Sequence, residues 1–261
     1  MMKKNIKRLY TSSSISSFFR FFLFLFFLFG LIEITISVFR LSPAAFARPS
    51  EIFFSVYAFF LPSMMLPDVL GTIQRTLLAF ILSFPVGIVF GIIASKSKYF
   101  DNELKFTIDF LRSIPATALI PLFLVLFGPH DLSKIAVGVF SGALSIAISV
   151  VVGEKSLNQD RKVVADLLKL RGFKRIILYE LPEMAPVIFV GSRTAASLCL
   201  ILVVVGEMFI GSNNGLGKVI MDTRYSDDVP TLYAAIVMTG VIGFFINFIF
   251  IYFEKRIKEY L

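Results

Sequence analysis

Six apolar runs, each long enough to cross a lipid bilayer as a helix, constrain this chain more than any other feature. The runs cover residues 21–39, 76–95, 106–127, 135–153, 187–210 and 232–253. A transmembrane helix needs about 20 predominantly apolar residues to span the hydrocarbon core. With 57% hydrophobic and only 17% charged residues, the 261-residue chain is too apolar for a soluble domain of its size. We predict an all-α membrane protein with six transmembrane helices.

The positive charges predict the orientation of these helices. Four segments, namely 1–20, 96–105, 154–186 and 254–261, hold 18 of the 26 Lys and Arg residues. The predicted external loops hold five, which are Arg40, Arg48, Lys134, Lys218 and Arg224, and the other three lie in or near the spans. Loops rich in Lys and Arg stay on the cytoplasmic side of a membrane. We therefore expect a cytoplasmic N-terminus over 1–20, a first span and external segment over 21–70, and a membrane core over 71–258, with both chain ends cytoplasmic.

The first apolar run also has to be weighed against a cleavable signal peptide. The sequence Ala45-Phe46-Ala47 resembles a cleavage site. However, the run over 21–39 has 19 residues, more than the roughly 7–15 of a signal peptide's apolar region. A retained helix is favoured.

The interval 154–186 is the longest charged stretch between apolar runs, and its pattern predicts helices. Asn158 or Asp160 can cap a first helix, and Gly172 can end it. One face of that helix is apolar and is formed by Val163, Val164, Leu167 and Leu168. A second helix over 173–181 is expected to stop at Pro182. Two interpretations stay open, an amphipathic loop lying on lipid headgroups and a docking element for a soluble partner.

Several predicted spans carry prolines and charges that a simple anchor does not need. Charged residues lie in or near the spans at Glu33, Arg75, Asp109, Arg112, Arg193 and Glu207, and prolines lie at Pro85, Pro115 and Pro121. Charge inside a membrane is costly and indicates either a transport pathway or ion pairing. Asp109 and Arg112 are spaced to pair on one helix. Glu207 and Arg193 are 14 residues apart, about four turns, and share one face of the fifth predicted span.

The chain carries no recognisable catalytic, nucleotide or metal motif. The glycine-rich stretch GEMFIGSNNGLGK over 206–218 lacks the spacing of a phosphate-binding loop, and we expect it to be a turn on the outer side. Cys199 is the one cysteine and His130 the one histidine, so we expect neither a metal site nor a cofactor. The net charge of +8 is spread over short loops, which does not favour nucleic acid.

A series of motifs over residues 70–258 resembles one family. The motifs are TIQRTLLAF at 72–80, LRSIPATALIPLFLVLFG at 111–128, Leu181-Pro182 with Ala185-Pro186, GSRTA at 191–195, Glu207 before Gly215-Leu216-Gly217, and FEKR at 253–256. They resemble the permease subunits of bacterial ATP-binding cassette (ABC) importers, in the branch that handles nitrate, taurine, aliphatic sulfonates and thiamine-precursor pyrimidines. The resemblance implies a type I importer permease in the bacterial inner membrane, crossing the bilayer several times.

The resemblance also implies partners and site residues. Separate ATPase subunits would bind ATP and Mg²⁺ and dock on coupling helices in the loop 154–186, while a second permease subunit, identical or related, and an external solute-binding protein complete the importer. Aligned from Leu181-Pro182, the family's Glu-Ala-Ala and Gly fall on Val163, Val164, Ala165 and Lys169, whereas a gap of three places the Glu on Asp166 and the Gly on Gly172. The coupling residues are then Val163, Val164, Ala165, Asp166, Leu167, Leu168, Lys169, Gly172, Leu181 and Pro182. The pathway residues are Glu207, Arg193, Arg112 and Pro115.

Two other classes of function stay open on the residues alone. One is a secondary transporter or channel that uses Glu207 or Glu33 as an ion site, although no internal repeat supports it. The other is a structural subunit that transports nothing. The three acids and three arginines in the spans balance, so charge counting does not identify the solute.

Overall fold

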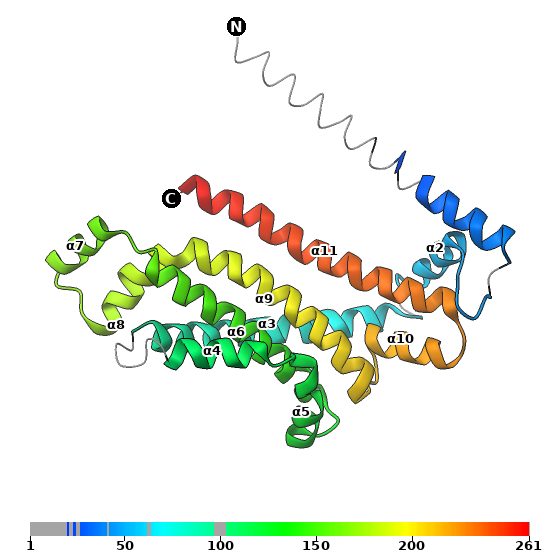
Figure 1. Cartoon of the computed structure of the whole chain (residues 1–261), viewed down its shortest axis with the longest axis horizontal. Helices are drawn as coiled ribbons and strands as arrows, with labels where there is room; N and C mark the ends of the chain where they lie inside the picture. The colour runs from blue at the N-terminus through cyan, green and yellow to red at the C-terminus, as the bar shows by residue number, and fades with distance from the viewer. Residues whose placement is uncertain are drawn as a thin grey trace, which may run out of the picture.

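The computed structural model describes Arg20 and residues 23–24, 27–40, 42–61, 64–96 and 103–260, and within these ranges the chain is helical with no strand. The helices are Phe27–Val38, α2 (Pro49–Ala58), α3 (Leu66–Lys96), α4 (Glu103–Ser113), η1 (Ala116–Leu119), α5 (Ile120–Phe127), α6 (Asp131–Lys155), α7 (Gln159–Leu167), α8 (Gly172–Arg175), η2 (Ile176–Glu180), α9 (Leu181–Ile210), α10 (Leu216–Tyr225) and α11 (Val229–Tyr260). Figure 1 shows an elongated bundle with α7 and α8 at one end and α10 at the other. We call these the α7 end and the α10 end.

Four continuous helices are long and apolar enough to cross a membrane. They cover Leu66–Lys96, Asp131–Lys155, Gly172–Ile210 and Val229–Glu254. These helices contain the predicted runs 76–95, 135–153, 187–210 and 232–253. The prediction of an all-α membrane protein is therefore confirmed.

The predicted third span, 106–127, is two helices rather than one. The segments Phe106–Ser113 and Ala116–Phe127 are bent by 80° at a break that contains Pro115. A proline has no N–H to bond the preceding turn and also disfavours helical geometry in the residue before it, here Ile114. The prediction of one continuous helix over 106–127 is wrong, and the bent pair counts as at most one broken span.

The predicted first span lies partly outside the described residues. Its described part includes a helix over Phe27–Val38, followed by α2, which packs against α11. Glu33 of this helix accepts hydrogen bonds from the backbone N and the hydroxyl of Ser50 at 3.1 and 2.8 Å. Since Ser50 lies in the first turn of α2, the Glu33 carboxylate satisfies a donor that the helix itself leaves free. Six spans therefore stay a prediction.

Glycines let α3, α6 and α9 approach each other closely. A Cβ atom at Gly91 of α3 would lie 2.5 Å from Cβ of Val150, and one at Gly191 of α9 would overlap the side chain of Ser149. Small residues at helix contacts are typical of membrane proteins, where close packing holds helices together. The three helices form the closely packed centre of the molecule.

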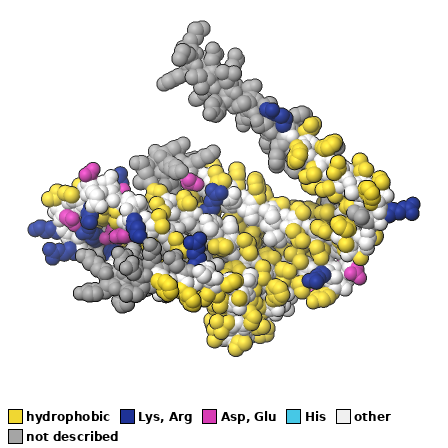
Figure 2. Space-filling model, in the orientation of Figure 1, with side chains coloured by type: hydrophobic (Ala, Val, Ile, Leu, Met, Phe, Trp, Pro, Cys, Tyr) yellow, Lys and Arg dark blue, Asp and Glu magenta, His cyan; other side chains and the backbone are white. Residues whose placement is uncertain are grey.

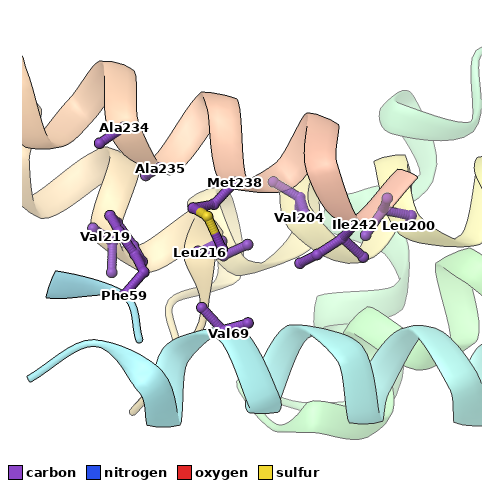
Figure 3. Close-up of a cluster of buried hydrophobic side chains, with 10 residues drawn as sticks. All are labelled: Phe59, Val69, Leu200, Val204, Leu216, Val219, Ala234, Ala235, Met238 and Ile242. Carbon is purple, nitrogen blue, oxygen red and sulfur yellow. The ribbon is translucent and has the colours of Figure 1, made fainter. Parts of the chain in front are cut away.

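A second packing centre joins α11 to this unit near the α10 end. Figure 3 shows the buried cluster, which includes Phe59 after α2, Val69 of α3, Leu216 of α10 and Met238 of α11. Large apolar side chains elsewhere on α3 and α11 are exposed, and Figure 2 shows apolar surface along the bundle with charges gathered at the α7 end. This distribution suits a molecule whose middle faces lipid.

Candidate functional site

A cavity of about 660 Å³ lies between the broken helix α4–η1, α6 and α9. Its polar lining consists of Arg112, Ser141, Ser145, Ser149 and Thr194, and the rest is apolar apart from Gly191. Arg112 is the one charged residue in this described lining. The cavity therefore offers a single positive charge and several hydroxyl groups to a small polar solute.

Three of these hydroxyls form a stripe along α6. Ser141, Ser145 and Ser149 are four residues apart and therefore share one face of the helix over about 12 Å. Ser149 donates a hydrogen bond to the carbonyl of Ser145 at 3.0 Å, and Ser145 donates one to the carbonyl of Gly191 at 3.3 Å. Both serines line the cavity, and their hydroxyl oxygens keep lone pairs that can accept a hydrogen bond.

The structure separates the four residues predicted to form the pathway. Arg112 lines the cavity, and Pro115 lies at the helix break between the lining residues Ile114 and Ala116. Arg193 is half-buried on α9 next to the lining residue Thr194. Glu207 lies toward the α10 end of the same helix, and the described contacts of its carboxylate do not include Arg193. The side chain of Asp109, the expected partner of Arg112, lies outside the described residues.

Glu207 is only 1% exposed and lies in a polar cluster at the α10 end. Its carboxylate accepts hydrogen bonds from the hydroxyl of Thr72 at 2.9 Å, from Arg75 Nη1 at 2.7 Å and from the backbone N of Gly217 at 3.0 Å. A buried charge requires a partner of this kind, because desolvation of an isolated carboxylate costs many kcal/mol. Thr72 and Arg75 come from α3, so the pair joins two helices that are distant in sequence.

Arg75 connects Glu207 to two other segments. Its Nη1 and Nη2 atoms donate to the carbonyl and the side-chain oxygen of Asn214 at 2.9 and 2.7 Å, and its Nε lies 2.9 Å from Asp131 Oδ1. Lys134 lies 2.9 Å from the same Asp131 oxygen and donates to the Ser212 hydroxyl at 3.1 Å. The cluster thus fixes the turn between α9 and α10 onto α3 and α6.

Two glycines near that turn lie so close to Glu207 and Val204 that no side chain would fit there. Gly215 has φ of 140°, and a Cβ at this position would lie 2.5 Å from Glu207 Cδ. A Cβ at Gly217 would lie 2.2 Å from the carbonyl oxygen of Val204. A turn at 211–215 lies within the predicted stretch 206–218, and its placement on the outer side stays a prediction. The close approach of the backbone to Glu207 and Val204 explains these glycines.

The charged interval 154–186 contains the predicted first helix, α7. Asn158 is its N-cap, and its side-chain oxygen accepts from the backbone N of Asp160 at 2.8 Å, as the cap prediction requires. The helix ends at Leu167, and Lys169 follows with φ of 52°. Gly172, predicted to end this helix, is instead the first residue of α8 with φ of 53°. The stop therefore comes earlier than predicted.

The predicted interruption at Pro182 is also wrong. A continuous helical stretch runs from Gly172 to Ile210 through the wide turn η2 and into α9. Pro182 lies directly after η2, at the second residue of α9. A proline is tolerated there because the wide turn separates its ring from the carbonyl that a regular helix would bring against it.

Large apolar side chains of this loop are exposed, while polar contacts hold the loop in place. Val163, Val164, Leu167 and Leu168 are all more than half exposed, whereas Ala165 is buried. Asp166 pairs with Arg175 at 2.6 Å and Glu183 pairs with Arg161 at 2.6 Å. The hydroxyl of Tyr179 donates to the Asn158 carbonyl at 3.0 Å. Contacts from α8, η2 and α9 therefore anchor α7, and its four large apolar side chains stay exposed within the described chain.

No group of three or more His, Cys, Asp or Glu side chains that could hold a metal ion occurs in the described part of the chain. The candidate functional features of the described chain are the cavity, the α10-end cluster and the exposed face of α7.

Comparison with known proteins identifies the family. A family profile described as "Binding-protein-dependent transport system inner membrane component" matches residues 83–259. The chain is 30% identical over 172 residues to a putative aliphatic sulfonates transport permease protein, SsuC, of Bacillus subtilis, covering 66% of this chain and 62% of that protein. It is 27% identical over 190 residues to the nitrate import permease protein NrtB of Synechocystis, covering 73% of this chain and 69% of that protein.

A third relative is archaeal. The chain is 29% identical over 180 residues to a putative ABC transporter permease protein, MJ0413, of Methanocaldococcus jannaschii, covering 69% of this chain and 67% of that protein. The family profile covers both sides of the cavity on α6 and α9, the loop with α7, and Glu207. This chain therefore belongs to the family of binding-protein-dependent transport system inner membrane components, the multi-pass permeases of ABC transporters.

Proposed function

We propose that this chain is the permease subunit of an ATP-driven importer, with both ends of the chain in the cytoplasm and six spans in the membrane. It forms the path for a small solute that an external binding protein delivers at the α10 end. Separate ATPase subunits bind ATP and Mg²⁺ and dock at the α7 end. The charge distribution along the sequence supports this orientation.

The exposed apolar face of α7 is the observation that carries the proposal. Leu167 and Leu168 are 76% and 67% exposed, although the loop around them is strongly charged. Exposed apolar residues rimmed by charges are typical of a protein interface, where a few anchors supply most of the binding energy. Lys169, Arg171 and Lys174 follow these anchors in the sequence and supply positive charge beside them. An ATPase subunit with an apolar groove is the partner that this face fits, and α7 then serves as the coupling helix.

The anchoring of α7 explains how motion of the ATPases reaches the pathway. The pairs Arg161–Glu183 and Asp166–Arg175 fix α7 to the start of the helical stretch Gly172–Ile210. That stretch continues past the cavity lining at Thr194 to the α10 end. Since a helix transmits displacement along its axis, movement of α7 would reorient the cavity walls.

The cavity and the names of the relatives together support a small anion as solute. The relatives are named for aliphatic sulfonates and nitrate, which are both anions. The described cavity lining carries Arg112 and no acidic residue. A positive charge in a largely apolar cavity favours an anion, because opposite charges attract more strongly where little water screens them. A second permease subunit, identical or related, would close the open side of this cavity.

Reconstitution tests the function. The chain, its ATPase and its binding protein are placed together in vesicles, and uptake of nitrate and methanesulfonate is measured. The proposal predicts uptake that requires both ATP and the binding protein. Uptake driven by a proton gradient without ATP would instead support a secondary transporter, and its absence under every condition would support a structural subunit.

A further inference from the structure

A second pocket lies at the α10 end, separate from the cavity. It has a volume of about 600 Å³ and a mostly polar lining, which includes Arg75, Asp131, Lys134, Ser212, Asn213 and Asn214. In the proposed orientation this pocket opens to the outside. We call it the outer pocket.

Two buried cations form one wall of the outer pocket. Lys134 is 1% exposed and Arg75 is 5% exposed, so neither side chain is a flexible surface charge. Both cations lie 2.9 Å from a single oxygen of Asp131, and the side chain of Asp131 is 53% exposed. The outer pocket therefore already holds one carboxylate, on its solvent-facing side, between two fixed positive groups.

The arrangement of two cations around one carboxylate suits an oxyanion as ligand of the outer pocket. An oxyanion that took the place of the Asp131 carboxylate would meet the same two cations, and Ser212 and Asn213 lie in the same lining. The exchange conserves charge, because one anion leaves the buried cations as another arrives. Asp131 has room to turn toward solvent, since more than half of its side chain is already exposed.

We propose that the outer pocket is a binding site for a small oxyanion, in competition with the side chain of Asp131. The proposal rests on the importer function above and adds to it a first site that the solute occupies before it reaches the cavity. In the cycle, solute released by the binding protein displaces Asp131 from Arg75 and Lys134. The return of Asp131 then expels the solute toward the cavity.

An apolar cluster separates the outer pocket from the cavity. Ile120 of α5, Val137 of α6 and Leu202 of α9 are buried against each other, with Phe123 packed beside them. Helices α6 and α9 line the pockets on both sides of this cluster. The segment before α5 lines the cavity, and the segment after α5 lines the outer pocket. We call it the barrier cluster.

Along both α6 and α9 the three sites follow one another in the same order in space. On α6, Lys134 lines the outer pocket, Val137 belongs to the barrier cluster and Phe140 lines the cavity. On α9 the order runs in reverse because the helix is antiparallel, with Leu198 at the cavity, Leu202 in the barrier cluster and Ile210 at the outer pocket. The outer pocket is therefore a distinct site, and the barrier cluster lies between it and the cavity along both helices.

Binding of nitrate and methanesulfonate to the purified full chain in nanodiscs tests the outer site. Titration calorimetry at constant ionic strength compares the wild type with Asp131→Asn and Lys134→Gln. Asp131→Asn removes the competing carboxylate and should tighten binding about tenfold, the size of a charge-assisted hydrogen bond. Lys134→Gln should abolish binding at this site. Lys134→Arg keeps the charge and should bind, which separates loss of charge from failure to fold.

Two controls make the outcome decisive. Lys218→Gln removes a positive charge on α10 that pairs with Asp222 and lies outside the outer pocket, so it should leave binding unchanged. The same series in an Arg112→Gln background removes the charge of the cavity, and the effects of Asp131→Asn and Lys134→Gln should persist there. If neither substitution changes the dissociation constant, or if Arg112→Gln alone abolishes all binding, the outer site is wrong. ATP-driven uptake by the wild type would still support the importer in that case.

Discussion

The carboxylate of Glu207 and the guanidinium of Arg75 lie 2.7 Å apart between α9 and α3, although 132 residues separate them in the sequence. Both side chains are buried, so little water screens the pair that joins the two helices. Such a pair is weak evidence for net stability, but removal of one partner leaves an uncompensated buried charge. We infer that Glu207 acts mainly on the structure of the α10 end.

Glu207→Gln should therefore destabilise the protein. The amide keeps the shape of the carboxylate but leaves Arg75 with only Asp131 as an anionic partner, and breaking a buried pair typically costs about 3–5 kcal/mol. Thermal unfolding in detergent should show a clearly lower midpoint than the wild type. An unchanged midpoint with impaired uptake would instead return Glu207 to the transport pathway, where the sequence had placed it.

Gly215→Ala should destabilise the same region for a steric reason. The new Cβ would lie 2.5 Å from Glu207 Cδ, in a backbone conformation with φ of 140°. Strain of this kind costs on the order of 1–3 kcal/mol. Gly240→Ala is the matched control, because nothing lies within 4 Å of its Cβ position in the middle of α11 and alanine favours a helix. Equal unfolding midpoints for the two variants would contradict this account of the turn.

Ile120→Ala should open a leak through the barrier cluster. Ile120 packs on Val137 and Leu202, and removal of most of its side chain leaves a gap between the outer pocket and the cavity. We expect ATP-independent efflux of nitrate from loaded vesicles to rise severalfold, with a loss of stability of roughly 2–5 kcal/mol. Val125→Ala, on the same helix but 83% exposed, should not leak. If nitrate leaves vesicles with either variant equally slowly, the barrier cluster does not close the path between the outer pocket and the cavity.

Arg112→Gln should reduce uptake of anions through the cavity. It removes the one charge of the described lining, and loss of a charged hydrogen-bond donor of about 1.5–3 kcal/mol corresponds to at least about a tenfold loss in kcat/KM. Arg112→Lys keeps the charge and should retain more activity. Uptake measured at several concentrations of nitrate checks this, and wild-type kinetics in Arg112→Gln would exclude Arg112 from the path.

Local signals predicted much of the fold, because they act within a few residues. The apolar runs predict the four continuous helices. The residue type predicts Asn158 or Asp160 as a cap, and the structure shows that Asn158 is the cap. Pro115 and Pro182 have the same local chemistry, yet one breaks a helix and the other does not. The wide turn η2 directly precedes Pro182, and no residue pattern in the sequence announces it.

The candidate sites were harder to predict, because their residues come from distant segments. Arg75, Asp131 and Glu207 meet only when α3, α6 and α9 pack together, and Lys134 was counted as a loop charge. Glu207 had no partner within a turn of its own helix, so the sequence favoured a pathway role. A buried charge must be paired, and this requirement indicates a cationic partner for Glu207. It does not distinguish Arg75 from Arg112 and Arg193.

Co-purification of the ATPase with variants of α7 tests the central claim most directly. Leu167→Ala and Leu168→Ala remove exposed anchors, and truncation of a buried interface anchor commonly costs more than about 2 kcal/mol. Lys169→Ala removes an exposed charge worth roughly 0–1 kcal/mol. We predict that at least one leucine variant loses the ATPase and ATP-driven uptake, whereas Lys169→Ala changes mainly the salt dependence of assembly. If both leucine variants, and a deletion of residues 160–175, still bind the ATPase and import solute like the wild type, α7 is not the coupling helix.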